Sequence, residues 1–112
     1  MSEEAFREGL KEILEDLEPR VERWTTFDQE GKVHGYPSEV EADVVVKDGK
    51  LIIIEIPSHI KASDIYQLKR KAELYKEKTG RKPDKLMAVT PYADKKAIKA
   101  AEKLGVEVYT RV

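Results

Sequence analysis

The feature that most constrains this chain is a pair of apolar segments, 40–47 and 50–56, joined by an Asp-Gly turn. Asp48-Gly49 favours a tight hairpin because both residues tolerate a positive φ angle. The flanking segments are rich in valine and isoleucine, whose branched side chains suit a pleated strand. We therefore predict two antiparallel strands that pair around this turn.

The two predicted strands differ in pattern, and the difference places a carboxylate in an apolar setting. In the first strand, Glu39, Glu41 and Asp43 fall on one face and apolar residues fall on the other. The second strand is apolar almost throughout, as is typical of a central strand covered on both faces, yet Glu55 lies near its end. Pairing around the turn puts Asp43 roughly opposite Glu55, with the two carboxylates close together on one face.

Two facing carboxylates repel each other, and this repulsion raises the pKa of at least one of them. A divalent cation would relieve the repulsion, and hard ions such as Mg²⁺ prefer carboxylate oxygens and keep several waters. The pair is therefore a candidate metal site. The alternative is structural, with Glu41, Asp43 and Glu55 paired with lysines from a neighbouring helix.

The order of these residues resembles that of the PD-(D/E)XK nuclease superfamily. Its pattern is an Asp on one strand, followed on the next strand by Asp or Glu, any residue and Lys. Here Asp43 is followed twelve residues later by Glu55-Ile56-Pro57, and Glu41-Ala42-Asp43 resembles the Glu-Ile-Asp form of the first half. The whole chain is similar to small archaeal members of unassigned role, and more remotely to archaeal Holliday-junction resolvases.

The resemblance implies a metal-dependent endodeoxyribonuclease that hydrolyses DNA phosphodiesters. Asp43 and Glu55 would hold Mg²⁺ or Mn²⁺, the backbone carbonyl of Ile56 would complete the shell, and Glu41 would be an auxiliary acidic residue. In this family the first helix often adds a further carboxylate. Helical phase leaves Glu3 nearest the apolar stripe of the first predicted helix.

One position departs from the family pattern, because Pro57 stands where the lysine belongs. Since that lysine positions the nucleophile and stabilises developing charge, cleavage is expected to be impaired or absent unless Lys61 or Lys69 substitutes. A domain that binds metal and nucleic acid without cutting, or an altered form of an active enzyme, would also fit. By the resemblance, Gln67, Lys69 and Arg70 are the candidates for nucleic-acid contact.

Hydrophobic periodicity and capping residues predict the other elements. A first helix is expected from Ser2 to Pro19, with an apolar stripe formed by Phe6, Leu10, Ile13, Leu14 and Leu17. Strands are expected at 20–27, 32–36, 85–90 and 106–109, and helices from Ser58 or Ser63 to Gly80 and over 94–104. The resulting order α-β-β-β-α-β-α-β predicts a restriction-endonuclease-like α/β core, with a mixed central sheet flanked by helices.

Composition limits the classes of function. With 21 basic and 22 acidic residues, the chain has a formal net charge of −1, so any nucleic-acid site has to be a local basic patch. The lack of cysteine excludes disulfides and thiolate metal sites. No apolar run approaches the roughly 20 residues of a bilayer span, and no signal peptide is visible. We therefore expect a cytoplasmic protein with no membrane association.

The length of 112 residues fits a single domain, 1–112, and the many mixed charges resemble the surface of a thermophile protein. A second class of function stays open beside the nuclease. The segment 106–109 could be an edge strand that pairs with a copy of itself, which would make the chain an assembly module or a homodimer.

Overall fold

A computed structural model describes residues 2–16 and 20–110 of the chain, and the side chains of 11–16 lie outside that description. The predicted stripe residues Ile13 and Leu14 are therefore described by their backbone alone. Leu17 and the predicted helix stop at Pro19 lie outside the described residues.

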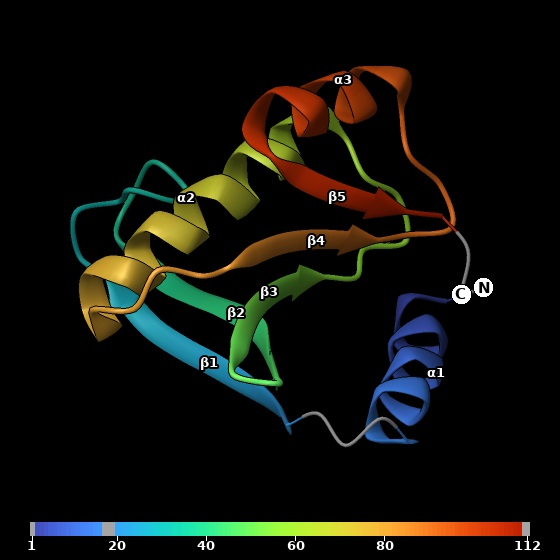
Figure 1. Ribbon diagram of the computed structural model, residues 1–112. Helices are drawn as coiled ribbons and strands as arrows, with labels where there is room; N and C mark the ends of the chain where they lie inside the picture. The colour runs from blue at the N-terminus through green and yellow to red at the C-terminus, as the bar shows by residue number, and fades with distance from the viewer. Residues whose placement is uncertain (1, 17–19, 111–112) are drawn as a thin grey trace.

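Within the described residues, helices and strands follow the predicted order α-β-β-β-α-β-α-β (Figure 1). They are α1 (Glu3–Asp16), β1 (Arg20–Asp28), β2 (Ser38–Lys47), β3 (Lys50–Glu55), α2 (Ala62–Thr79), β4 (Lys85–Val89), α3 (Lys95–Leu104) and β5 (Val106–Tyr109). Of the helices in this part of the chain, none combines the length and the apolar character that crossing a bilayer requires.

The five strands form one mixed sheet in the order β1-β2-β3-β4-β5. β1, β2 and β3 pair antiparallel, whereas β3, β4 and β5 pair parallel through the crossover helices α2 and α3. The predicted Asp-Gly hairpin is confirmed, since Asp48 has φ 52° and Gly49 has φ 77°. Lys47 pairs with Lys50 directly across this turn.

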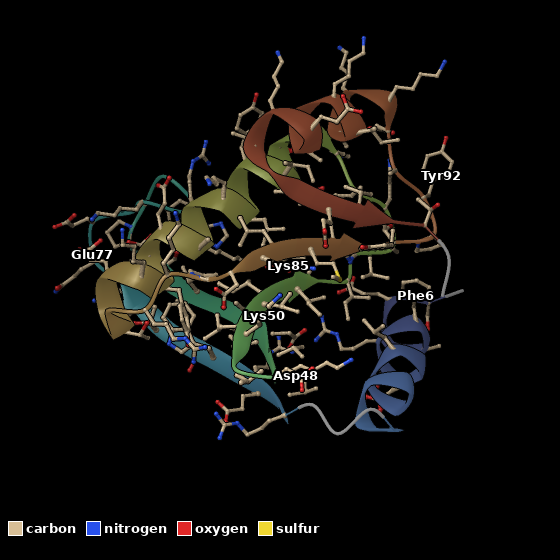
Figure 2. The ribbon with its side chains drawn as sticks, viewed as in Figure 1. Phe6, Asp48, Lys50, Glu77, Lys85 and Tyr92 are labelled. Carbon is tan, nitrogen blue, oxygen red and sulfur yellow. The ribbon has the colours of Figure 1, made fainter. Side chains whose placement is uncertain are left out.

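Helices cover both faces of the sheet (Figure 1). The larger core lies between the sheet and the pair α2 and α3, where Ile53 and Ile65 are fully buried. A smaller core lies beneath α1, whose Phe6 packs against Ile54 and Ile56 and points toward the sheet (Figure 2). β3 therefore has buried side chains on both faces, as its apolar sequence predicts.

The predicted short strand at 32–36 is wrong, because residues 29–37 form turns between β1 and β2. Gly31 and Gly35 adopt φ angles of 67° and 87°, which strands do not use. The buried carboxylate of Asp28 accepts a hydrogen bond of 2.8 Å from the backbone N–H of Val33. This bond closes the loop on itself and removes the backbone donors from strand pairing.

Asp28→Asn is expected to lower the melting temperature, most strongly at neutral pH. Backbone N–H groups, chiefly that of Val33, hold the pKa of Asp28 below its ordinary value. A lowered pKa stabilises the fold above the unfolded-state pKa of about 3.9, and the contribution is lost as the pH falls through the folded-state pKa. Thermal melts from pH 7 to pH 3 should show the difference between wild type and Asp28→Asn shrinking with acid. Asp48→Asn, in the exposed hairpin turn, is the matched control, and an equal loss in this variant would contradict the assignment.

β2 and β3 separate at one end of the sheet, and this separation creates the room for a site. Their pairing runs from Lys47–Lys50 to Asp43–Ile54 and stops there. Beyond that point β2 continues toward Ser38 beside β1 alone. The end of β3 is thus open on its β2 side.

Candidate active site

The register between β2 and β3 differs by one residue from the predicted one. Asp43 pairs with Ile54 instead of Glu55, because the two-residue turn sets Lys47 against Lys50. Since side chains alternate along a strand, a shift of one residue moves a side chain to the other face. Asp43 thus leaves the sheet on the α1 side and Glu55 on the α2 side, and the predicted same-face arrangement of the two carboxylates is wrong.

The two carboxylates nevertheless meet in one pocket, at the point where β2 and β3 separate. This acidic pocket has a volume of about 420 Å³. It is lined by Glu3, Arg7, Arg23, His34, Glu39, Glu41, Ala42, Asp43, Glu55 and Lys71. Asp43 and Glu55 are close enough for the charge of Asp43 to contribute to the raised pKa of Glu55. Among the described side chains, five carboxylates therefore share the pocket with two arginines and one lysine.

Asp43 lies between two guanidinium groups. Arg7 Nη1, from α1, is 3.4 Å from Asp43 Oδ2, and Arg23 Nη1, from the paired position on β1, is 3.9 Å from Oδ1. Only 10% of the Asp43 side chain is exposed, so the two guanidinium groups offset the cost of burying a carboxylate there. Arg7 Nη2 also lies 3.5 Å from Oε1 of Glu3. Arg7 therefore links a carboxylate of α1 to Asp43 on β2.

Glu55 is paired with a lysine from α2. Lys71 Nζ donates a hydrogen bond of 2.6 Å to Glu55 Oε1, and both side chains are mostly buried. Burial raises the pKa of Glu55, and the charge and hydrogen bond of Lys71 act in the opposite direction. The Lys71 ammonium therefore offsets part of the cost of keeping this carboxylate ionised in an apolar place.

Lys71 lines the acidic pocket and contacts Glu55, and the sequence did not predict this placement. By its charge alone, Lys71 resembles the other lysines and arginines of the segment 69–82. The usable signal is its helical position, three residues after Leu68 and four before Tyr75. Those two residues face the core, so Lys71 lies on the sheet side of α2 rather than on its solvated face.

Glu41 and Glu3 lie toward the outside of the acidic pocket. Glu41 is exposed and accepts a hydrogen bond from Arg23 Nη2, which lowers the pKa of Glu41 below its ordinary value. Glu3 was the first-helix carboxylate favoured by helical phase, and it lines the pocket as well. Both therefore line the same pocket as Asp43 and Glu55.

The other lysine candidates lie elsewhere. Lys61 is exposed at the start of α2, where its backbone N–H donates to Asp64. Lys69 lines a separate groove between α2 and the end of α3, and Pro57 is half-buried just beyond β3. None of the three lines the acidic pocket, so Lys71 is the lysine that the fold brings to Glu55.

The predicted nucleic-acid contacts and the predicted backbone ligand also lie outside the lining of this pocket. Arg70 Nη1 donates to the carbonyl of Val33 at 3.4 Å, which ties α2 to the β1–β2 loop. Gln67 is half-buried on α2, and the side chain of Ile56 is buried in the core beneath α1. The structure does not bring Gln67, Lys69 and Arg70 together with the carboxylates.

The donor set fits a magnesium-like ion better than a fully protein-ligated metal. No cluster of three or more acidic, histidine or cysteine side chains arranged to hold a metal occurs within the part of the chain that the structure describes. Mg²⁺ is commonly held by one or two carboxylates together with waters and substrate phosphates. Asp43 and Glu55 supply two such carboxylates, each now neutralised by a basic side chain.

The five-stranded mixed sheet, its flanking helices and the pocket at the strand separation define a restriction-endonuclease-like domain. A family model described as the PD-(D/E)XK nuclease superfamily matches residues 38–107. The match covers more than half of the chain, and the chain belongs to this superfamily. Residues 1–37 match a second family, described as a protein of unknown function (DUF3782).

A solved structure supports the same fold. The structure of EndoMS in apo form shares 24% sequence identity and has a TM-score of 0.66. The match covers 99% of this chain and 46% of that chain, so this chain spans about half the length of EndoMS. No curated protein matches the sequence.

Proposed function

We propose that this chain is a metal-dependent nuclease-type domain that acts on DNA phosphodiesters, with residues 1–112 working as one domain. The observation that supports this most strongly is the acidic pocket itself. Asp43 and Glu55 enter it from adjacent strands, and Lys71 lies 2.6 Å from Glu55. Two carboxylates and one amine are the side chains that the superfamily uses, and this chain belongs to it.

Asp43 and Glu55 would hold Mg²⁺ or Mn²⁺, with Glu41 as an auxiliary carboxylate. The Ile56 carbonyl stays a prediction of the family resemblance, since Ile56 does not line the pocket. When bound, the ion would polarise the phosphoryl group and supply a water of lowered pKa. Asp43 and Glu55 bring their negative charge into the same pocket from opposite faces of the sheet. Arg7 and Arg23, now beside Asp43, could turn to substrate phosphates once a cation takes their place.

Lys71, rather than Lys61 or Lys69, is the proposed substitute for the family lysine. Its ammonium lies next to Glu55, where it could orient the attacking water and offset the charge that develops on the phosphate. Under this proposal Pro57 does not by itself decide activity. The degree to which cleavage is impaired then depends on how well the amine of Lys71 replaces that of the family lysine, which would stand at the position of Pro57.

A non-catalytic role is the second candidate, and the ion pairs favour it. Asp43 is matched by Arg7 and Glu55 by Lys71, so these two carboxylates have basic partners without any metal. In that case the acidic pocket would be structural, or it would belong to a module that binds nucleic acid without cutting it. The predicted pairing of β5 with a copy of itself stays a prediction of this second class.

Nicking of supercoiled plasmid and cutting of branched DNA test the proposal. In Mg²⁺ or Mn²⁺ we expect cleavage by the unmodified chain and none by Asp43→Ala or Glu55→Ala, since each removes one of the two proposed ligands. Glu39→Ala serves as the matched control, because Glu39 is an exposed carboxylate of the same pocket. Cleavage that persists unchanged in both ligand variants would rule the acidic pocket out as its source.

A further inference from the structure

Charge is divided very unevenly along this nearly neutral chain. The first 55 residues contain 15 acidic and 7 basic residues, whereas residues 56–112 contain 7 acidic and 14 basic residues. The second part forms α2, β4, α3 and β5, so its positive charge gathers around the two crossover helices. Side chains that end in nitrogen project from α3 away from the sheet (Figure 2). The overall charge of −1 therefore conceals a basic side of the molecule.

A groove on this side collects four lysines. It has a volume of about 390 Å³ and lies between α2, the segment 82–86 and the end of α3. Its lining is Lys69, Ala72, Glu73, Lys76, Lys82, Pro83, Asp84, Lys85, Leu86, Leu104 and Gly105. We call this the lysine groove. Among the residues that the structure describes, it shares no lining residue with the acidic pocket.

The positive charge of the lysine groove is largely uncompensated. Among the described residues, no ion pair engages Lys69, Lys76 or Lys82, and Lys85 reaches Glu107 only at 4.0 Å. Gathered like charges repel one another, and a cleft lined by one sign of charge concentrates counter-ions. The arrangement therefore favours an anionic occupant.

Two acidic side chains also line the lysine groove, but they do not balance it. Asp84 Oδ2 accepts a hydrogen bond of 2.8 Å from the backbone N–H of Leu51, which commits this carboxylate to holding β3. Glu73 is exposed and lies among the lysines. Four ammonium groups thus face two carboxylates, of which one already has a backbone partner.

The floor of the lysine groove is apolar. Ala72 and Leu86 are each 7% exposed, and the half-buried Leu104 packs against the same core. A plain inorganic anion would gain nothing from such a floor. A ligand with an anionic group and a flat apolar part would use both the rim and the floor, and the volume lies in the range of small-molecule sites.

We propose that the lysine groove binds a nucleotide unit, with the phosphate at the lysines and the base against Ala72, Leu86 and Leu104. The unit would come from a single-stranded nucleic-acid segment or from a free nucleotide. Lys69 and Lys71 are two residues apart on α2 and so point about 200° apart around the helix. The groove and the acidic pocket therefore lie on different sides of α2, and the proposal goes beyond the nuclease because neither Asp43 nor Glu55 takes part.

Fluorescence anisotropy with a labelled oligothymidylate tests the proposal, using the full chain in EDTA. The chelator removes any metal from Asp43 and Glu55, so failure of the proposed nuclease would leave the measurement unaffected. We expect the double variant K76E/K82E to weaken binding at least about tenfold, which corresponds to ~1.4 kcal/mol. The matched control K96E/K99E makes the same change of charge on the exposed side of α3, and we expect it to weaken binding less than about threefold.

A variant of opposite sign strengthens the test. Glu73→Gln removes a carboxylate from among the lysines and should tighten binding by about two- to fivefold. A reduction shared equally by K76E/K82E and K96E/K99E would overturn the proposal, because it would reflect general charge attraction. Unchanged binding in a folded K76E/K82E protein, verified by its thermal melt, would overturn it as well.

Competition distinguishes the source of the nucleotide unit. If thymidine monophosphate displaces the oligonucleotide, the groove accepts free nucleotides. If only unlabelled oligonucleotide displaces it, the groove serves a nucleic-acid strand, and the salt slope then gives the number of phosphates held. Displacement by inorganic phosphate as efficient as by either nucleotide ligand would overturn the role of the apolar floor.

Discussion

Lys71→Met should reduce metal-dependent DNA cleavage by on the order of a hundredfold, or about 3 kcal/mol of barrier. Lys71 Nζ is 2.6 Å from Glu55 Oε1, and the methionine side chain keeps the long apolar stem while removing the charge. Loss of the ammonium also leaves Glu55 buried without its partner, which raises the pKa of Glu55 further. The measurement is the initial rate of plasmid nicking in saturating Mg²⁺.

Pro57→Lys supplies the complementary arm of that experiment. It places an amine at the family position, and folding should tolerate it because lysine accepts the extended backbone that proline occupies. If Lys71 carries the role, Pro57→Lys should restore cleavage in the Lys71→Met background and add little to the unmodified chain. If the unmodified chain is inactive and Pro57→Lys alone activates it, Lys71 is not an adequate substitute and the expected impairment is correct.

Two lysines outside the acidic pocket provide the controls, Lys61 just before α2 and Lys69 on α2. Lys61→Met and Lys69→Met make the same chemical change at positions that do not line the acidic pocket. Neither should alter the cleavage rate by more than about threefold under saturating DNA. A hundredfold loss in either one, with Lys71→Met unaffected, would contradict the assignment of Lys71.

The fold followed from local signals in the sequence. The Asp-Gly turn fixes the central hairpin, since both turn residues adopt the positive φ angles that favour these two residue types. The apolar character of β3 correctly predicts burial on both faces, and the periodicity of α2 and α3 places these helices against the sheet. Each of these features depends on residues within a few positions of one another, which is why a sequence pattern can reveal them.

The details of the site depend on longer-range geometry. An antiparallel register is sensitive to a single residue, and the separation of β2 from β3 after Asp43 is visible only when both strands are placed. Lys71 meets Glu55 because α2 crosses the sheet at that end, and Arg7 meets Asp43 because α1 packs beneath it. No local pattern predicts either contact. The helical phase of Lys71 indicates only that its side chain lies on the sheet side of α2.

Saturating Mn²⁺ should raise the melting temperature of this chain by ten degrees or more. An ion that binds only the folded state at 100 times its Kd adds about 2.7 kcal/mol to the free energy of unfolding. For a domain near this size, each kcal/mol shifts the melting temperature by roughly 4–8 °C. Thermal melts with and without Mn²⁺ measure the shift, and Asp43→Ala should abolish it while Glu39→Ala should retain it.

The surroundings of Asp43 make the interpretation of that variant specific. Relief of carboxylate repulsion would stabilise Asp43→Ala, but Arg7 and Arg23 would then face each other without their shared partner. We therefore expect Asp43→Ala to melt below the wild type in the absence of metal. The wild type and Asp43→Ala therefore have to be compared by the change in melting temperature that Mn²⁺ causes in each. Equal shifts in both proteins would place the ion outside the acidic pocket, and no shift in either would favour the structural role of the ion pairs.

Replacement of Arg7 and variation of the pH also test whether Mn²⁺ binds at Asp43 and Glu55. Arg7→Gln removes the guanidinium that competes for Asp43, so it should tighten Mn²⁺ binding and enlarge the melting-temperature shift at subsaturating ion.

Because burial raises the pKa of Glu55, protons compete with the ion at a higher pH than they would for an ordinary glutamate. The shift should be complete above the raised pKa and should fade as the pH falls through it. A shift that is independent of pH down to 4 would mean that the ion does not use Glu55.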